Sequence, residues 1–115
     1  MWSLFSLLED LKPQFSAALG RQVGLAELTI ISIQLSPQQA LVVTNRNIYL
    51  FRRGILRVRA NVISIGEIDL IRVVGRDLVL EGAKGILGRL QFNHKKELQV
   101  PVYQKLEGLI LKKQR

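Results

Sequence analysis

Arginines dominate the part of this sequence that could carry chemistry. Five of them lie within fourteen positions with no acidic residue among them: Arg46, Arg52, Arg53, Arg57 and Arg59. A guanidinium group offers forked N–H donors that match the oxygens of a phosphate or a carboxylate. The cluster therefore predicts a surface that binds anions, such as lipid headgroups or nucleic acid. The alternative is a solvated sheet face whose charge prevents edge-to-edge strand pairing.

Other residues that could take part in catalysis are few. His94 is the only histidine and there is no cysteine, so neither a disulfide nor a thiolate metal site can form. Glu67 and Asp69 share a strand face, where solvated carboxylates or partners for arginine are more common than an acid/base pair. The glycines between residues 82 and 88 lack the spacing of a phosphate-binding loop and indicate a hairpin loop instead. We therefore predict a non-enzymatic protein without a metal or cofactor.

Size and charge limit the function further. The chain has 115 residues, of which 48% are hydrophobic and 23% charged, which is typical of one globular domain. Its net charge of +8 favours anionic partners. No apolar run approaches the roughly 18 residues that a bilayer crossing needs. Without cysteine, and with Glu9 and Asp10 interrupting an N-terminus that has no basic leader, we expect a cytoplasmic protein, with room for membrane association.

The N-terminal segment 1–22 is expected to be helical. Its apolar residues recur at three- and four-residue steps between Trp2 and Leu19, which predicts one amphipathic helix with a kink or break at Pro13. This apolar stripe exceeds what one small core needs. It is therefore a candidate surface for a protein partner or a second copy of the chain, with the contact residues Trp2, Phe5, Leu8 and Phe15.

Residues 23–115 alternate with the period of β-strands and then return to helical spacing. About seven short strands are predicted, separated by turns such as Ser36-Pro37-Gln38 and Asn45-Arg46-Asn47. Pro101 suits the first turn of a C-terminal helix. The expected strands cover residues 28–35, 40–44, 48–51, 56–62, 65–74, 78–80 and 90–92, with one more alternation at Leu98 and Val100.

Three segments resemble the bacterial pleckstrin-homology-like domains. Residues 40–51 (ALVVTNRNIYLF) are similar to the second and third strands of that family, and residues 65–73 (IGEIDLIRV) to a central strand. Leu98-Gln99-Val100-Pro101 followed by a helix resembles its last strand and capping helix. The resemblance implies a mainly β fold, a barrel of about seven antiparallel strands capped by the C-terminal helix, to which this chain adds an N-terminal helix.

The poor catalytic signals and the apolar N-terminal stripe predict an interaction module rather than an enzyme. Members that bind phosphoinositides carry basic residues around the first turn, whereas Ser36-Pro37-Gln38-Gln39 has none. Specific inositol-phosphate recognition of that type is therefore not expected. A protein-protein or self-assembly scaffold is the first hypothesis. Peripheral binding to anionic membranes through the arginine cluster is the second, and nucleic-acid binding ranks below both.

Overall fold

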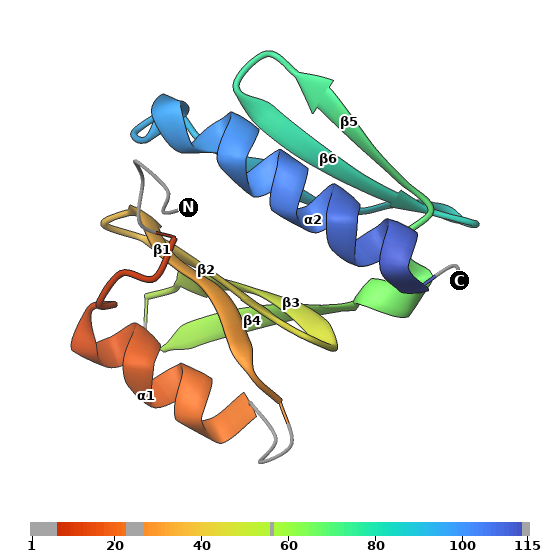
Figure 1. Cartoon of the computed structure of the whole chain (residues 1–115). Coiled ribbons are helices and arrows are strands. Elements are labelled where there is room, and N and C mark those ends of the chain that lie inside the picture. The colour runs from red at the N-terminus through yellow and green to blue at the C-terminus, as the bar shows by residue number, and fades with distance from the viewer. Residues whose placement is uncertain (1–6, 23–26, 56, 114–115) are drawn as a thin grey trace.

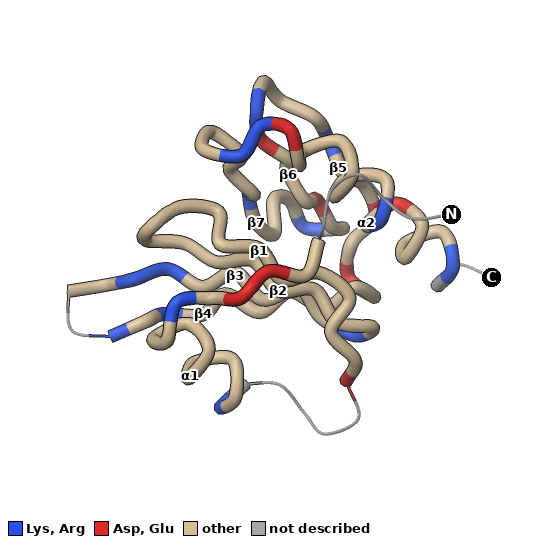
Figure 2. Tube along the Cα trace, turned by 60° about the vertical axis from the view of Figure 1, so that its left-hand side comes forward, with Lys and Arg blue, Asp and Glu red and all other residues tan. Residues whose placement is uncertain are grey.

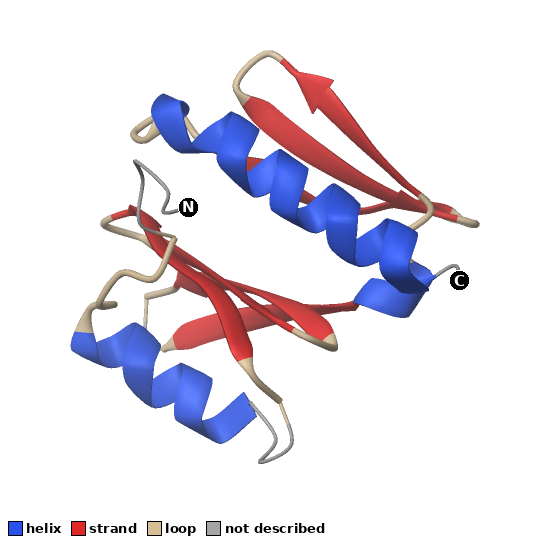
Figure 3. Ribbon diagram, viewed as in Figure 1, coloured by secondary structure: helices blue, strands red, loops and turns tan. Residues whose placement is uncertain are grey.

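The computed structural model describes residues 7–22, 27–55 and 57–113. Within them the chain forms two helices, seven strands and two short 3-10 turns, mainly β as expected (Figure 3). In chain order these are α1 (Pro13–Gln22), β1 (Thr29–Ser36), β2 (Gln39–Thr44), β3 (Asn47–Arg53), β4 (Val58–Ser64), η1 (Ile65–Glu67), β5 (Leu70–Val74), β6 (Asp77–Gly82), β7 (Gly85–Gln91), η2 (Lys96–Leu98) and α2 (Gln99–Lys113).

The first sheet is an antiparallel meander in the order β1-β2-β3-β4. Every residue of β2 is buried, because the sheet is covered on both faces. One face packs into the main core. The other packs against α1, where Phe15 and Ala18 meet Ala40, Val42, Tyr49 and Phe51 in a second, smaller core (Figure 1).

The second sheet has the order β5-β6-β7 and faces the first across the main core. Helix α2 runs along the opening between the two sheets and adds Val102, Leu106 and Ile110 to that core (Figure 1). Among the described residues no strand ladder joins one sheet to the other. The sheets therefore do not close into a continuous barrel, and the expected barrel is not confirmed.

The N-terminal helix is shorter than the sequence indicated. Helix α1 begins at Pro13, so the break expected at this proline is confirmed as the start of the helix. The prediction of helix before it is wrong for residues 7–12. There the chain runs beside β1 in a parallel bridge between Leu8 and Ser32, with Glu9 N donating to Ser32 O at 2.6 Å. These hydrogen bonds cover the outer edge of β1, which would otherwise be unpaired.

Two further corrections concern residues 82–88 and the alternation at Leu98 and Val100. The hairpin expected at residues 82–88 is present, but its loop is shorter: only Ala83 and Lys84 form the turn, and β7 begins at Gly85. Gly88 lies inside β7, and glycine fits there because a Cβ would come within 2.7 Å of the Ile63 side chain on β4. The alternation at Leu98 and Val100 is not a strand, since Leu98 ends η2 and α2 begins at Gln99.

The expected strand 65–74 is also divided. Residues 65–67 form η1, a 3-10 turn in which the Ser64 hydroxyl accepts from Gly66 N. The strand β5 starts only at Leu70. This turn redirects the chain from the first sheet to the second. Neither helix in the described ranges has the length and apolarity needed to cross a membrane.

Candidate functional site

Four of the five clustered arginines meet on the β3–β4 hairpin. Arg52 and Arg53 end β3, Arg57 directly precedes β4, and Arg59 is paired across the strands with Arg52. Figure 2 shows the basic segments of these two strands side by side. Arg46 does not join them, because it lies in the β2–β3 turn at the other end of these strands. We refer to Arg52, Arg53, Arg57 and Arg59 as the hairpin arginines.

The hairpin arginines surround shallow hollows that the N-terminal segment completes. Arg57 and Arg59 line one hollow together with Arg21 of α1. Arg53 and Arg57 line another with Lys12. The sequence analysis did not single out Lys12 and Arg21, because they precede Arg52 by 40 and 31 positions and no local pattern connects them to the hairpin. No carboxylate lines either hollow.

Within the described residues, the hairpin arginines have no acidic partner. The ion pairs of the described chain involve Arg72, Arg89 and Lys95, and none involves residues 46–59. The one acidic residue between Lys12 and Ser64 is Glu27. Its carboxylate accepts from the Thr44 hydroxyl at 2.7 Å and from the Tyr49 hydroxyl at 2.8 Å. The hairpin arginines therefore keep their charge uncompensated.

The Glu27 cluster is a second feature that the sequence analysis missed. Asn47 Nδ2 also donates to Glu27 Oε1, at 3.0 Å, so three side chains of the first sheet hold this carboxylate. Tyr49 is 2% exposed, and burial together with its hydrogen bond to Glu27 raises the pKa of the Tyr49 hydroxyl. With its polar groups satisfied in this way, the cluster stabilises the fold rather than offering a binding site.

An apolar residue projects from the tip of the basic hairpin. Ile55 has an exposed fraction of 102%, so it packs against nothing in the described chain. The tip is tightly closed: Gly54 N donates to Arg57 O at 2.8 Å, and a Cβ on Gly54 would approach that oxygen to 2.9 Å. The turn therefore needs glycine at position 54, and it presents isoleucine to solvent between the two pairs of arginines.

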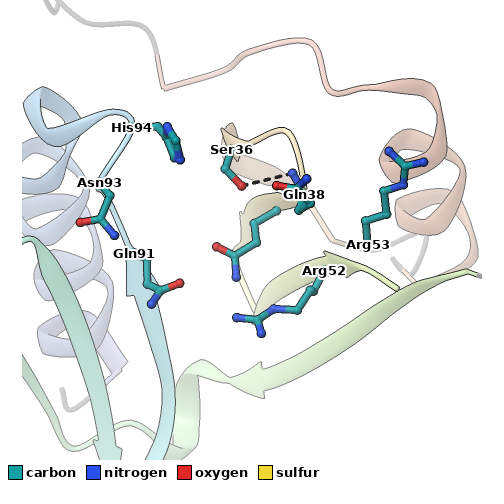
Figure 4. A pocket seen from close by; sticks show the side chains of 8 residues that line it. Ser36, Gln38, Arg52, Arg53, Gln91, Asn93 and His94 are labelled. Carbon is teal, nitrogen blue, oxygen red and sulfur yellow. Dashed lines mark hydrogen bonds between the residues drawn. The ribbon is translucent and has the colours of Figure 1, made fainter. Parts of the chain in front are cut away.

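A polar cleft lies beside the hairpin, between the two sheets. Its volume is about 350 Å³, and its walls come from three segments far apart in the chain (Figure 4). The β1–β2 turn and the end of β3 form one wall. The end of β7 and the loop after it form the other. The lining residues are Ser36, Gln38, Gln39, Arg52, Arg53, Gln91, Asn93 and His94.

His94 thus lies in the cleft, but its neighbours do not favour catalysis. No carboxylate lines the cleft, so no Asp or Glu is placed to orient the imidazole. In the described parts of the chain no three His, Asp or Glu side chains gather in a way that could hold a metal ion. Glu67 and Asp69 instead line a separate hollow with Lys84.

The four predicted contact residues of the N-terminal segment have different environments. Trp2 and Phe5 lie outside the described residues. Leu8 is 61% exposed beside β1. Phe15 is fully buried in the second core, so α1 uses this side chain to pack on its own sheet.

Comparison with known proteins yields no relative. No protein-family model, no curated protein and no solved structure matches this chain. The functional argument therefore rests on the geometry of the hairpin and the cleft.

Proposed function

We propose that this protein binds anionic membrane surfaces through the β3–β4 hairpin. The observation that carries the proposal is the fully exposed Ile55 at the tip, flanked by four arginines without an acidic partner. Arginines beside an anionic bilayer bind lipid phosphates, while an apolar tip residue enters the boundary between headgroups and acyl chains. A purely structural hairpin would gain nothing from exposing both kinds of residue together.

The expected strength of this contact is moderate. Each basic residue near an anionic membrane contributes about 1 kcal/mol. Burying one isoleucine side chain contributes about 2 kcal/mol. Four arginines and one isoleucine then give a dissociation constant of roughly tens of micromolar relative to accessible lipid. Such an affinity makes binding reversible and strongly dependent on salt.

Nucleic acid fits the site less well, although it also carries phosphates. Single-stranded nucleic acid is usually held by exposed aromatic rings on which the bases stack. The aromatic residues on the same strand as Arg52 and Arg53 are Tyr49 and Phe51, which stack on each other with ring centroids 6.1 Å apart. Both are buried in the second core. The hairpin therefore offers charge and an aliphatic tip, a combination that suits a lipid surface.

Vesicle co-sedimentation tests the proposal. The protein should sediment with phosphatidylcholine vesicles that contain phosphatidylserine, and the bound fraction should fall as salt rises. Changing Arg53, Arg57 and Arg59 to Glu should abolish binding. The same charge change at Lys84, Lys105 and Lys112, which are exposed and line none of the hairpin hollows, should leave most of it.

The apolar tip has its own control. Ile55→Ser should weaken vesicle binding about thirtyfold, because the roughly 2 kcal/mol from the anchoring side chain is lost. Ile86→Ser changes an isoleucine that is 67% exposed on the other sheet and should have no effect. Equal binding to vesicles of phosphatidylcholine alone, or tighter binding to an oligonucleotide that displaces the vesicles, would refute the membrane proposal.

Self-association through the N-terminal segment stays a second proposal. It is favoured by Leu8, which is exposed although it is apolar and adjoins the stretch that contains Trp2 and Phe5. Deleting residues 1–6 removes none of the described residues of the second core. The deletion should lower the mass measured by light scattering, and an unchanged mass would contradict self-association.

The finer fold class is likewise a proposal: a pleckstrin-homology-like arrangement of the two sheets. It is supported by the order of elements, four meandering strands, three further strands and a C-terminal helix along the opening. An experimental structure in which β4 or β1 pairs with the second sheet would support this class, and sheets packed without any such corner would argue against it.

A further inference from the structure

The cleft holds polar side chains that the fold leaves without partners. In the described structure, the side chains of Gln91, Asn93 and His94 form no hydrogen bond. All three come from one short stretch and line the cleft opposite Arg52 (Figure 4). Amide and imidazole groups both donate and accept hydrogen bonds, so together they suit a ligand that carries several hydroxyl groups.

Arg52 supplies the charge on the opposite wall. The Gln39 amide lies against its guanidinium, and with the amide oxygen turned toward Arg52 that oxygen accepts from Nη2 at 2.6 Å and from Nε at 3.1 Å. Gln39 is 9% exposed, so this contact fixes the guanidinium from a nearly buried position. Three of the five N–H donors of Arg52 remain available for a ligand. With no carboxylate in the cleft, that ligand should be an anion.

The N-terminal segment braces both walls of the cleft. On one side, Gln34 Oε1 accepts from Lys12 N at 3.0 Å, while Gln34 Nε2 donates to Ser36 O at 2.8 Å and to Gln39 O at 3.2 Å. On the other, Lys95, next to His94, donates to Glu9 Oε1 at 2.5 Å. Walls fixed in this way lose little freedom when a ligand binds.

We propose that this cleft binds a phosphorylated polyol, with the phosphate on Arg52 and the hydroxyl groups on Gln91, Asn93 and His94. The volume of about 350 Å³ suits a small molecule. The cleft shares Arg52 and Arg53 with the hairpin, but its other lining residues come from the β1–β2 turn, the end of β7 and the loop after it, and its ligand can be tested without a membrane. A free polyol phosphate and the headgroup of a lipid such as phosphatidylglycerol share this chemistry.

NMR titration of the full chain in the absence of vesicles tests the site. Glycerol 3-phosphate should shift the backbone amides of residues 36, 38–39, 52–53 and 91–94 and reach saturation. Inorganic phosphate should bind there about tenfold more weakly, because it lacks the hydroxyl groups. Equal affinities, or shifts spread over all exposed arginines, would mean that phosphate merely acts as a counterion and would overturn the proposal.

Substitutions provide the second test. Arg52→Gln should weaken glycerol 3-phosphate binding tenfold or more, since it removes the charge-assisted hydrogen bonds, by about 1.4 kcal/mol at least. Arg72→Gln removes the same charge from the second sheet and should leave binding unchanged. Gln91→Ala and His94→Ala, at a partly buried and an exposed position that tolerate truncation, should each weaken binding severalfold. Full affinity in both alanine variants would exclude the cleft.

Competition identifies the source of the ligand. If the cleft takes a lipid headgroup, the protein should prefer phosphatidylglycerol to phosphatidylserine vesicles of equal charge, and excess glycerol 3-phosphate should remove the preference. If it takes a soluble molecule, glycerol 3-phosphate should bind while the two vesicle types bind equally. Either result supports the cleft. If the protein binds glycerol 3-phosphate in the NMR titration but does not bind anionic vesicles, the hairpin proposal alone is refuted. If neither glycerol 3-phosphate nor phosphatidylglycerol vesicles bind saturably at the cleft, the cleft proposal is refuted.

Discussion

The arginines of the two sheets differ in what surrounds them. On the second sheet, Arg72 pairs with Glu81 at 2.5 Å and Arg89 pairs with Asp77 at 3.3 Å. These two arginines flank Val79 across the strands, and Val79 is only 2% exposed. Their aliphatic stems cover an apolar residue while their charges are neutralised. On the first sheet, the hairpin arginines form no ion pair with any described carboxylate, and they flank an isoleucine that is fully exposed.

The difference separates a structural use of arginine from a binding use. Paired arginines on the second sheet complete a surface, and a ligand would have to displace their partners. The hairpin arginines repel one another, so the fold alone gains nothing from their proximity. This repulsion is relieved when an anion binds, which is why the hairpin and its cleft are the places where binding is expected.

The contrast between the arginines of the two sheets would not hold if the Glu27 carboxylate compensated the charge of the hairpin arginines. We expect that it does not, because Thr44, Asn47 and Tyr49 hold its carboxylate. Glu27→Leu should lower the free energy of unfolding by about 3 kcal/mol, since these buried donors lose their acceptor. Urea unfolding measures this loss, with the exposed Glu107→Leu as the control.

Vesicle affinity of the same Glu27→Leu variant decides the question. It should remain within twofold of the original chain at temperatures where the variant is folded. A marked gain in affinity would show that Glu27 normally compensates the hairpin charge, and the distinction between the two sheets would then be lost.

Neutralising two arginines on each sheet sharpens the comparison directly. Arg57→Gln with Arg59→Gln should weaken binding to anionic vesicles about thirtyfold, at about 1 kcal/mol per charge, with an unchanged melting temperature. Arg72→Gln with Arg89→Gln has the same net charge and should keep most of the affinity while melting lower. Equal losses of affinity would mean that net charge alone, rather than the hairpin, governs binding.

Local patterns explain which parts of this fold could be predicted. The first three strands follow from β-branched alternation and from turns at Pro37 and Asn45, so they were placed to within a few residues. β7 was largely missed because Gly85 and Gly88 resemble a loop when their contacts are unknown. The spacing of Leu8 and Leu11 fits a helix, but pairing with β1 extends this stretch, and no sequence period reveals that partner.

The candidate sites also could be predicted only where their residues lie close together in the sequence. The hairpin arginines lie close together in the sequence, so their cluster was evident and only the exclusion of Arg46 had to come from the structure. The cleft could not be predicted. Its segments 36–39, 52–53 and 91–94 are far apart in the chain, and glutamine, asparagine and histidine are ordinary surface residues until the sheets bring them together.

Alkaline pH should affect the partnered residues and spare the hairpin. Burial and the Glu27 hydrogen bond raise the pKa of Tyr49 above its usual value of 10.0 in the folded state. The unfolded chain therefore loses the Tyr49 proton first, so stability is full below pH 10 and declines as pH rises beyond it. Urea unfolding at several pH values should show this decline, and Tyr49→Phe should reduce it. An identical decline in Tyr49→Phe would contradict the role of this hydroxyl.

The brace between Glu9 and Lys95 can be weakened without removing any group that lines the cleft. Glu9→Gln should reduce glycerol 3-phosphate affinity a few-fold, because the loop carrying Asn93 and His94 loses its ionic contact. Asp10→Gln, at an exposed neighbouring position, is the matched control. An unchanged affinity in Glu9→Gln would show that the cleft keeps its shape without the N-terminal segment.

The smallest effect is expected for the ion pair on the second sheet. Arg72 and Glu81 are close, but the arginine side chain is 60% exposed, so solvent screens the pair and limits its value to at most about 1 kcal/mol. A double-mutant cycle with Arg72→Gln and Glu81→Gln, followed by urea unfolding, measures that coupling. Coupling near zero would still leave the two sheets distinct, because the comparison requires only that Glu81 neutralises Arg72. Vesicle binding supplies the decisive measurement: Glu81→Gln frees one arginine on the second sheet. If Glu81→Gln strengthens vesicle binding by the roughly 1 kcal/mol that we assign to each hairpin arginine, the position of the charge is unimportant and the hairpin has no special role.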